Sequence, residues 1–503
     1  MLPPISDVYR GKSIFITGAT GFVILEKLLR SLDVASVIVL IRDTRKMSAE
    51  WRVLFEQLRS SRPGVLQKVK VVRGDISLDN LGLSEEDYDA VCSECSFVFH
   101  IAATVKFNDE LPNALDLNVK GTKRVIEMCR KMPRLECLLH CSTAYSNCEL
   151  GHVEERFYPS EYDADKLIDL VDAIDDVSHA TTKIMGKKFN SYCFTKALAE
   201  GVVVAAGTEI PCLIFRPSIV TGVWRDGIPG WVQGLAGMAA RSYASAMGIL
   251  CETSCARRSI ADFIPVDVVS NMAIVAAAYR SSLKDNSVPV LHCTSGALNP
   301  ITHGEALEYG NKVMWQFPLE GALGTPLSRP ARPLVTKAKN VLKEHVLGTV
   351  VDTCLIVSGK RTFVRRAFSK ASELYEVLSP FTEGEFFFAN NSIPMLLSLM
   401  SPSDRKTFNF DIRELDWEDH AFDCVLGIKR FIAGEDIYDE ERMWKARVRR
   451  NRLWLAEKMG SILVCYLISV VMTGTFPPPP PLWIVPKRNV RNCFDDLSNP
   501  ESQ

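Results

Sequence analysis

Two tyrosine–lysine pairs in this sequence have a spacing suited to proton donation. Tyr162 precedes Lys166 by four positions, and Tyr192 precedes Lys196 by the same interval. Residues at i and i+4 share one face of a helix, so each ammonium group can approach its phenol. A nearby positive charge lowers the pKa of a phenol from about 10, so that it can protonate the alkoxide left by hydride transfer to a carbonyl. Either pair could therefore serve carbonyl reduction.

The surroundings favour the second pair. Tyr162 lies in the acidic stretch 161–165, and carboxylates raise the pKa of a phenol. Tyr192 opens a segment whose small residues, within 194–200, let a helix pack closely on a sheet. A solvated helix pair is the alternative interpretation of this spacing. We expect Tyr192 to be the proton donor and Lys196 to be its partner.

Other polar residues follow apolar runs that read as strands. Ser142 and Thr143 close one run, and Pro217 and Ser218 follow another, while Asn118 places an amide inside a helix. Ligands of open α/β sheets bind at the carboxyl edge of the strands. We expect these side chains to converge there.

A glycine turn near the N-terminus is the element expected to hold a cofactor. The apolar run 13–16 passes directly into this turn, and a helix is expected over 24–29. A strand, a glycine turn and a helix N-terminus together form a site for a dinucleotide pyrophosphate. The turn residues expected to bind it are Thr17, Gly18, Thr20, Gly21 and Phe22.

One position of this turn departs from the usual fingerprint. Three positions after Gly21, where a third small residue normally lets the helix press on the strand, the sequence has Ile24. The pattern reads as if about one helical turn had been removed. Overpacking at such a contact costs about 1–3 kcal/mol, which motivates the alternative of a non-catalytic homologue.

Two residues at the ends of later strands bear on cofactor choice. Arg42 lies about 20 residues after the glycine turn, where an acidic residue would bind a ribose hydroxyl and an arginine would bind a 2′-phosphate. Asp75 could accept a hydrogen bond from the adenine amine, or could cap a helix. Arg42 favours NADPH over NADH.

The elements that must position these residues alternate along the first 280 residues. Helical patterns such as 111–131 and 195–205 separate the strands, which is typical of a parallel sheet covered on both faces. We expect an α/β, Rossmann-type, doubly wound domain, followed beyond 299 by mostly helical structure. The expected strands are 13–16, 34–41, 69–72, 97–101, 135–140 and 211–215.

Composition narrows the function classes. The 503 residues are 47% hydrophobic and 24% charged, which fits two or three structured units. A formal net charge of -1 provides no overall field for nucleic acid. Cys92 and Cys95 form a C-x-x-C pair without a second Cys/His pair, so no metal is expected.

The C-terminal region changes in character. Residues 442–458 are rich in Arg, Lys and Trp, 461–475 are apolar, and five prolines fill 477–481. The apolar run is shorter than the roughly 20 residues of a spanning helix, although Trp454 and Phe476 could extend it. We expect a membrane tail with its basic flank in the cytosol; a tail helix docked on the protein is the alternative.

Taken together, these segments resemble the fatty acyl-CoA reductases, which are extended short-chain dehydrogenase-like enzymes. The resemblance covers most of the chain and is therefore more specific than any single motif. It rests on 17–22, 26–30, 74–75, 102–105, 118–122, 142–145, 192–200, 216–222, 228–231, 264–268 and 408–411, together with Trp417.

The resemblance implies that a long-chain acyl-CoA is reduced to a fatty alcohol with two NADPH, through a bound aldehyde. It implies Lys196 as the ribose anchor and Thr143 or Ser142 as the hydroxyl partner of the carbonyl oxygen. It implies an endoplasmic reticulum membrane location, with the peroxisomal membrane as the alternative. The further residues expected to contact the cofactor are Ala102, Ala103, Asn118, Tyr192, Lys196, Pro217 and Ser218. A sterol dehydrogenase or sugar epimerase of the same superfamily is the competing interpretation. The implied units are a reductase domain over 1–299, a connecting helical region over 300–357, a reductase-associated helical domain over 358–458 and a hydrophobic tail over 459–503.

Overall fold

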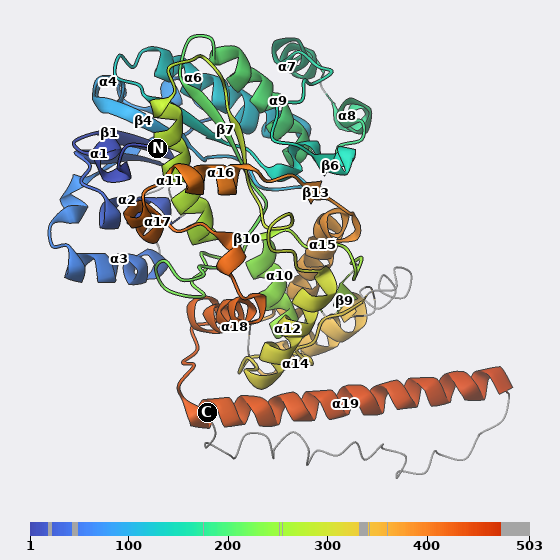
Figure 1. Ribbon diagram of the computed structural model, residues 1–503. Coiled ribbons are helices and arrows are strands. Elements are labelled where there is room, and N and C mark those ends of the chain that lie inside the picture. Colours follow the sequence, from blue (N-terminus) through green and yellow to red (C-terminus); the bar gives the residue numbers. More distant parts are fainter. Residues whose placement is uncertain are drawn as a thin grey trace.

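A parallel sheet flanked by helices forms the centre of the molecule (Figure 1). The structure is a computed structural model that describes residues 1–18, 23–42, 49–174, 176–250, 252–253, 255–330, 341, 343–359 and 361–473. Within these residues, seven parallel strands pair in the order β11-β7-β5-β4-β1-β2-β3. They are β1 (Ser13–Thr17), β2 (Ser36–Ile41), β3 (Val69–Arg73), β4 (Cys95–His100), β5 (Cys137–Cys141), β7 (Cys212–Pro217) and β11 (Val290–Cys293).

Helices cover both faces of this sheet, which explains why its central strands are apolar along their whole length. One face packs against α1 (Ile5–Tyr9), α2 (Ile24–Ser31), α3 (Ala49–Ser61), α11 (Val266–Ser282) and α16 (Ser392–Leu399). The other face packs against α4 (Glu85–Glu94), α6 (Gly121–Arg130) and α9 (Ser191–Ala206). The expected doubly wound Rossmann-type fold is confirmed.

Short helices and strand pairs extend from the carboxyl edge of the sheet. The pairs are β8 (Ile219–Thr221) with β10 (Phe263–Pro265), β9 (Glu252–Thr253) with β12 (Arg329–Pro330), and β6 (His152–Val153) with β13 (Phe387–Phe388). The helices are α5 (Leu111–Leu115), α7 (Ala164–Asp172), α8 (Ser178–Met185), α10 (Gly237–Ala246) and α12 (His303–Gln316).

The C-terminal part is mostly helical, as expected. It contains α14 (Thr349–Val357), α15 (Val364–Glu383), α17 (Pro402–Thr407), α18 (Trp417–Gly427) and α19 (Glu440–Thr473). Phe408 and Phe410 are buried in the same core as the sheet, so this part packs on the reductase fold rather than apart from it.

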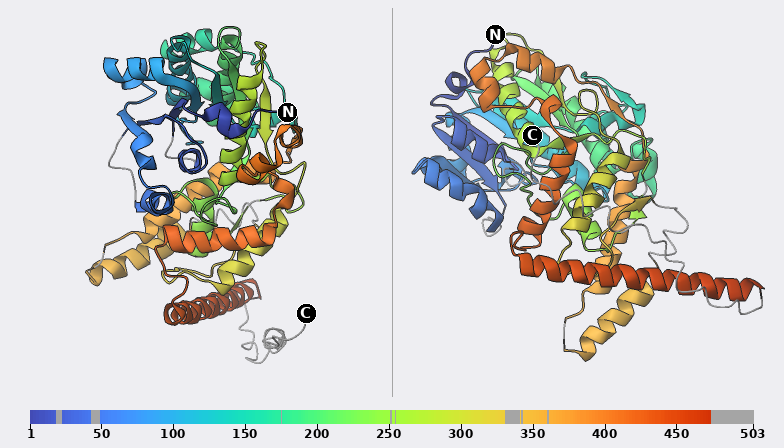
Figure 2. Two further views of the ribbon diagram at one scale, coloured as in Figure 1. Left: turned by 60° about the vertical axis from the view of Figure 1, so that its left-hand side comes forward. Right: turned by 60° about the horizontal axis from the view of Figure 1, so that its bottom comes forward.

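The long helix α19 lies along the outside of the molecule (Figures 1 and 2). The basic stretch 442–458 and most of the apolar run 461–475 belong to this one helix, and 474–475 lie outside the described residues. In the part of the chain that the structure describes, no helix is both long and apolar enough to span a bilayer.

The differences from the expected elements are local. The expected helix 111–131 is interrupted by a π-helical turn over Asp116–Lys120. Strand β11 was not expected, because it has only four residues and His292 interrupts its apolar pattern.

Candidate active site

The glycine turn begins where β1 ends. Gly18 has φ +75°, and a Cβ there would lie 2.6 Å from the backbone nitrogen of Ala102. Only glycine fits this close approach and this left-handed conformation. Thr17 Oγ1 accepts a hydrogen bond of 3.3 Å from the same nitrogen, so the turn is joined to the segment after β4 that contains Ala103. Thr20, Gly21 and Phe22 lie outside the described residues.

The unusual Ile24 is a core residue. It is the first residue of α2, and its buried side chain belongs to the cluster formed by the sheet and α11. The larger side chain is therefore accommodated in the hydrophobic core.

A buried ionic contact anchors α2 to distant parts of the chain. Lys27 Nζ donates to Asp226 Oδ2 and to the carbonyl oxygen of Thr407, each at 2.5 Å. Burial lowers the pKa of Lys27, and the charge of Asp226 partly offsets this. Asp267 in turn accepts hydrogen bonds of 2.9–3.0 Å from the backbone nitrogens of 224–226. These contacts join α2, which follows the glycine turn, to the segments that contain Asp226 and Thr407.

The two residues expected to select the cofactor lie side by side. Arg42 Nη1 is 3.9 Å from Asp75 Oδ2, and the side chain of Arg42 is 72% exposed. Asp75 Oδ1 also accepts a hydrogen bond of 2.9 Å from the hydroxyl of Ser77. The guanidinium group is thus accessible at the end of β2, where a ribose would lie.

The catalytic pair opens α9 at the carboxyl edge of the sheet. Asn190 caps this helix by accepting a hydrogen bond of 2.8 Å from the nitrogen of Cys193. Tyr192 is partly buried, and Lys196 is buried one turn further along. The ammonium group of Lys196 donates to the carbonyl oxygen of Cys141 at 2.7 Å, at the end of β5.

Burial controls the pKa of both groups. It raises the pKa of Tyr192, the thiols of Cys141 and Cys193 add to the rise, and the hydrogen-bonded hydroxyl of Thr143 opposes it. Burial lowers the pKa of Lys196, with partial compensation from Cys141 and Glu200. The pKa of Tyr192 is thus shifted in the opposite direction to the lowering expected from the sequence, because burial dominates and Lys196 is not among the groups that shift it. The phenol is protonated in this structure.

The structure separates the two hydroxyls that the sequence left as alternatives. Thr143 is the partner of the phenol. Ser142 instead donates to Glu200 Oε1 at 2.5 Å, and Glu200 is held by Arg216 through Nη2 at 2.6 Å. Ser142 thus belongs to a buried ionic network, whereas Thr143 is hydrogen-bonded to the phenol of Tyr192.

Asn118 connects the helix beside the site to the catalytic helix. It lies in the π-helical turn, accepts a hydrogen bond of 2.9 Å from the nitrogen of Thr104, and donates to Thr195 Oγ1 at 2.9 Å. Such turns are frequent at functional sites. At the neighbouring strand, Pro217 ends β7 and the nitrogen of Ser218 donates to the carbonyl oxygen of Cys293 at 3.1 Å.

The other tyrosine–lysine pair does not form a site. The backbone nitrogen of Lys166 donates to the capping carboxylate of Asp163 in the first turn of α7. The ring of Tyr162 packs edge-on against Phe194 at 6.1 Å between centroids. Helix α7 lies at the outer end of the molecule, away from the cofactor turn (Figure 1).

Sequence reasoning missed an aromatic cover over the phenol. Phe107 packs edge-on against Tyr192 with centroids 5.4 Å apart, and Phe381 lies 5.0 Å from Phe107. Phe381 comes from the end of α15, nearly 190 residues after Tyr192. No local pattern signals a contact between segments so far apart.

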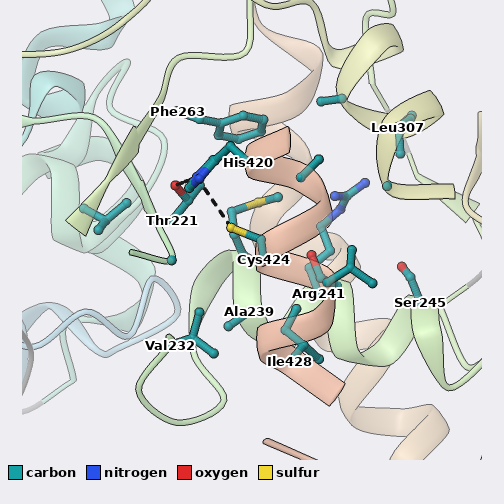
Figure 3. A pocket seen from close by; sticks show the side chains of 18 of the residues that line it. Thr221, Val232, Ala239, Arg241, Ser245, Phe263, Leu307, His420, Cys424 and Ile428 are labelled. Atoms are coloured by element: carbon teal, nitrogen blue, oxygen red, sulfur yellow. Dashed lines mark hydrogen bonds between the residues drawn. The ribbon is translucent and has the colours of Figure 1, made fainter. Parts of the chain in front are cut away.

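An apolar cavity of about 290 Å³ lies between α10, α12 and α18 (Figure 3), and neither Tyr192 nor Phe381 is among the residues that line it. Ile219 packs against both the aromatic cluster of Tyr192 and the cluster of Phe263 that borders the cavity. His420 is a polar point in the cavity wall, with Nε2 2.9 Å from Thr221 Oγ1. Burial lowers the pKa of His420 to about 4, so this imidazole is neutral at pH 7.

Comparison with known protein families identifies two matching regions. A family model named for NAD binding and described as male sterility protein matches residues 16–273. A second model with the same description matches residues 344–435. The first match supports a nicotinamide cofactor for this domain.

Curated relatives cover nearly the whole chain. Fatty acyl-CoA reductase 1 of Rattus norvegicus is 34% identical over 447 residues, and that of Xenopus laevis is 35% identical over 454 residues. Fatty acyl-CoA reductase 2 of Bos taurus is 34% identical over 450 residues. Each alignment covers 86% of this chain and 87% of the relative.

Solved structures agree on the fold. The terminal R domain from the myxalamid PKS-NRPS pathway has a TM-score of 0.57 at 19% identity. The reductase (R) domain of a non-ribosomal peptide synthetase from Mycobacterium tuberculosis has a TM-score of 0.51 at 16% identity. Each comparison covers 86% of this chain and 94% of the other.

Proposed function

The chain belongs to the fatty acyl-CoA reductase family, and from that premise we propose that it reduces a long-chain fatty acyl-CoA to a fatty alcohol and CoA. The observation that carries this proposal is the meeting of Tyr192, Lys196 and Thr143 at the carboxyl edge of the sheet, beside an apolar cavity. An acid for the reacting oxygen and an apolar space for the chain are what such a substrate requires.

The proposed mechanism assigns a role to each of these groups. NADPH, held by the glycine turn and Arg42, would supply the hydride that reduces the thioester carbonyl carbon and then the aldehyde carbon. The hydroxyl of Thr143 and the phenol of Tyr192 bind the carbonyl oxygen in both steps. The phenol gives its proton to the alkoxide of the final product. Lys196 lies one turn along the same helix and brings positive charge to the site.

The first reduction ends differently from the second. Once the thioester carbonyl is reduced, its oxygen can re-form the carbonyl by expelling the CoA thiolate, which leaves an aldehyde. The aromatic cover of Phe107 and Phe381 over Tyr192 supports retention of that aldehyde, because it shields the reacting oxygen from water. The bound aldehyde then accepts the second hydride and the proton.

The cavity is the proposed site for the acyl chain. Its wall is mainly apolar. Ile219 lies between the cavity and Tyr192, because it packs against both the cluster of Phe263 and the aromatic cluster of Tyr192. A chain that enters from the carbonyl site would pass this residue and extend towards α12 and α18. Burial of each methylene contributes about 0.8 kcal/mol, which favours long chains.

NADPH is the proposed form of the cofactor. Support comes from Arg42, whose exposed guanidinium group stands at the end of β2. The carboxylate of Asp75 is close enough to orient this group, but at 3.9 Å it does not engage it in a hydrogen bond. A 2′-phosphate would provide an anionic partner to which this guanidinium group can donate two parallel hydrogen bonds.

The site of action proposed for the chain is the endoplasmic reticulum membrane, with the reductase fold in the cytosol. Support comes from the sequence alone, in which the basic stretch 442–458 precedes the apolar run 461–475. The peroxisomal membrane is the alternative. Fluorescence microscopy of the tagged full chain against markers of both organelles distinguishes them.

Lipid analysis of yeast that expresses this chain tests the proposed activity. We expect new fatty alcohols that are absent from cells with an empty vector and from cells that express Tyr192→Phe. Absence of alcohol from cells with folded, abundant protein would favour the non-catalytic alternative, particularly if NADPH causes no thermal shift.

A further inference from the structure

A helical hairpin projects from the body of the molecule (Figure 2). Its first arm is the π-helical turn Lys343–Gly348 followed by α14, and its second arm is the beginning of α15. The arms pack tightly, since a Cβ on Gly348 would lie 2.9 Å from Arg365 Cα. Asp352 accepts hydrogen bonds of 3.0–3.1 Å from the backbone nitrogens of 363–365 and so caps the second arm.

The outer surface of this hairpin is apolar although it faces solvent. No residue of α14 is buried. Near the turn, Ile356 is 64% exposed and Val357 is 85% exposed. Soluble proteins rarely leave large contiguous apolar patches uncovered, so such a patch marks an interaction surface. The other exposed apolar side chains of the hairpin are Val346, Leu347, Val350 and Phe363.

Exposed cationic side chains follow the apolar tip along the chain. Arg361 precedes the second arm, and Arg365, Arg366 and Lys370 lie in its first two turns. The carboxylate of Asp352 is turned towards the backbone that it caps. Exposed apolar and cationic side chains on one hairpin match the acyl and anionic headgroup layers of a lipid surface.

The second arm leads directly to the catalytic site. Helix α15 has 20 residues and is therefore about 30 Å long. Along it, Glu373 accepts a hydrogen bond of 2.6 Å from Asn108 Nδ2, and at its end Phe381 packs on the cover of the catalytic tyrosine. The tip is thus held at a fixed distance from the active site.

We propose that the tip of this hairpin, formed by 346–359 and 361–366, inserts into the interfacial layer of an anionic lipid bilayer. This contact is separate from the C-terminal tail and lies in the domain that covers the active site. Insertion would place the lipid phase at the beginning of α15. The active site, which binds the water-insoluble acyl chain, lies at the other end of this helix. The proposal does not depend on catalytic turnover.

Cys354 offers a direct test, because it is exposed on α14. A polarity-sensitive fluorophore is attached to the full chain and to Cys354→Ser, and the difference between them isolates the signal from α14. We expect phosphatidylserine–phosphatidylcholine vesicles to shift this emission to the blue, and nitroxide-labelled lipids to quench it about twofold. Vesicles of phosphatidylcholine alone should have a smaller effect.

Paired variants test the chemistry of the tip. Ile356→Asp with Val357→Asp should abolish the shift, and Arg365→Gln with Arg366→Gln should remove its dependence on phosphatidylserine. Leu170→Asp changes a side chain that is 50% exposed on the distant helix α7 and should leave the shift intact. Thermal unfolding of each variant confirms that it is folded.

Two outcomes would overturn the proposal. One is an unchanged emission from the fluorophore on Cys354 when flotation shows that the full chain has bound the vesicles. This result would mean that other segments alone bind the membrane. The other is a shift that grows with protein concentration without lipid, which would assign the patch to contact between copies of the chain.

Discussion

Replacement of Tyr192 by phenylalanine removes one hydroxyl while it keeps the ring. The edge-on contact with Phe107, at 5.4 Å between centroids, requires only the ring and is retained. The hydroxyl's hydrogen-bond partner is Thr143, and loss of such a neutral hydrogen bond costs about 1 kcal/mol. We therefore expect Tyr192→Phe to fold with nearly unchanged stability.

Catalysis should suffer far more than stability. A positioned general acid contributes a factor of about 10² to 10⁴, which is about 3–5 kcal/mol at 1.36 kcal/mol for each tenfold change. The phenol is the group placed to supply this proton, because Lys196 is engaged with the carbonyl oxygen of Cys141 and Ser142 with Glu200. The loss should appear in kcat, with a small change in KM for acyl-CoA.

The assay follows NADPH oxidation and fatty alcohol formation by purified full chain, with thermal unfolding measured in parallel. Tyr162→Phe is the matched control, since it makes the same change in the other tyrosine–lysine pair and should leave kcat unchanged. Full activity in Tyr192→Phe, or a large loss in Tyr162→Phe, would refute the assignment of the proton donor.

Three further changes probe other parts of the site. Gly18→Ala should reduce cofactor affinity at least tenfold, because the added Cβ would lie 2.6 Å from the backbone nitrogen of Ala102 at a position with positive φ. Isothermal titration measures this affinity, and an undiminished value would contradict the geometry of the turn. Arg42→Ala should raise KM for NADPH but not for NADH, and steady-state kinetics with both cofactors would disprove the 2′-phosphate role if the two values rose together. The pKa of His420 is about 4 in the folded protein and about 6.5 in an unfolded chain. Between these pH values only the unfolded chain binds the proton. The free energy of unfolding therefore falls as the pH drops from about 6.5 to about 4. His420→Gln should remove up to about 3 kcal/mol of that fall, as measured by urea unfolding at several pH values, and an unchanged pH dependence would show that this imidazole is not buried as described.

The sequence predicted the parts of the fold that depend on local pattern. The apolar runs of the central strands appear because both faces of the sheet are covered, and six of the strands were found within a few residues. Strand β11 was not predicted, because it has only four residues and His292 interrupts their apolar run. The break in the helix 111–131 escaped because a π-helical turn has no composition of its own.

The helical neighbourhood of Tyr192 and Lys196 was predicted for a similar reason, since their spacing is local. The choice between Ser142 and Thr143 needed the structure, because adjacent residues after a strand point to different sides. The aromatic cover from Phe381 and the cavity beside Ile219 depend on contacts between distant segments. Such contacts are set by tertiary packing and have no local signal.

The ratio of NADPH oxidised to fatty alcohol formed tests the central claim most directly. Purified full chain is supplied with a long-chain acyl-CoA, and both quantities are measured with free aldehyde in the same reaction. The account predicts two NADPH for each alcohol and no accumulation of aldehyde. A ratio of one with free aldehyde as the product, or no oxidation of NADPH by folded protein, would contradict it.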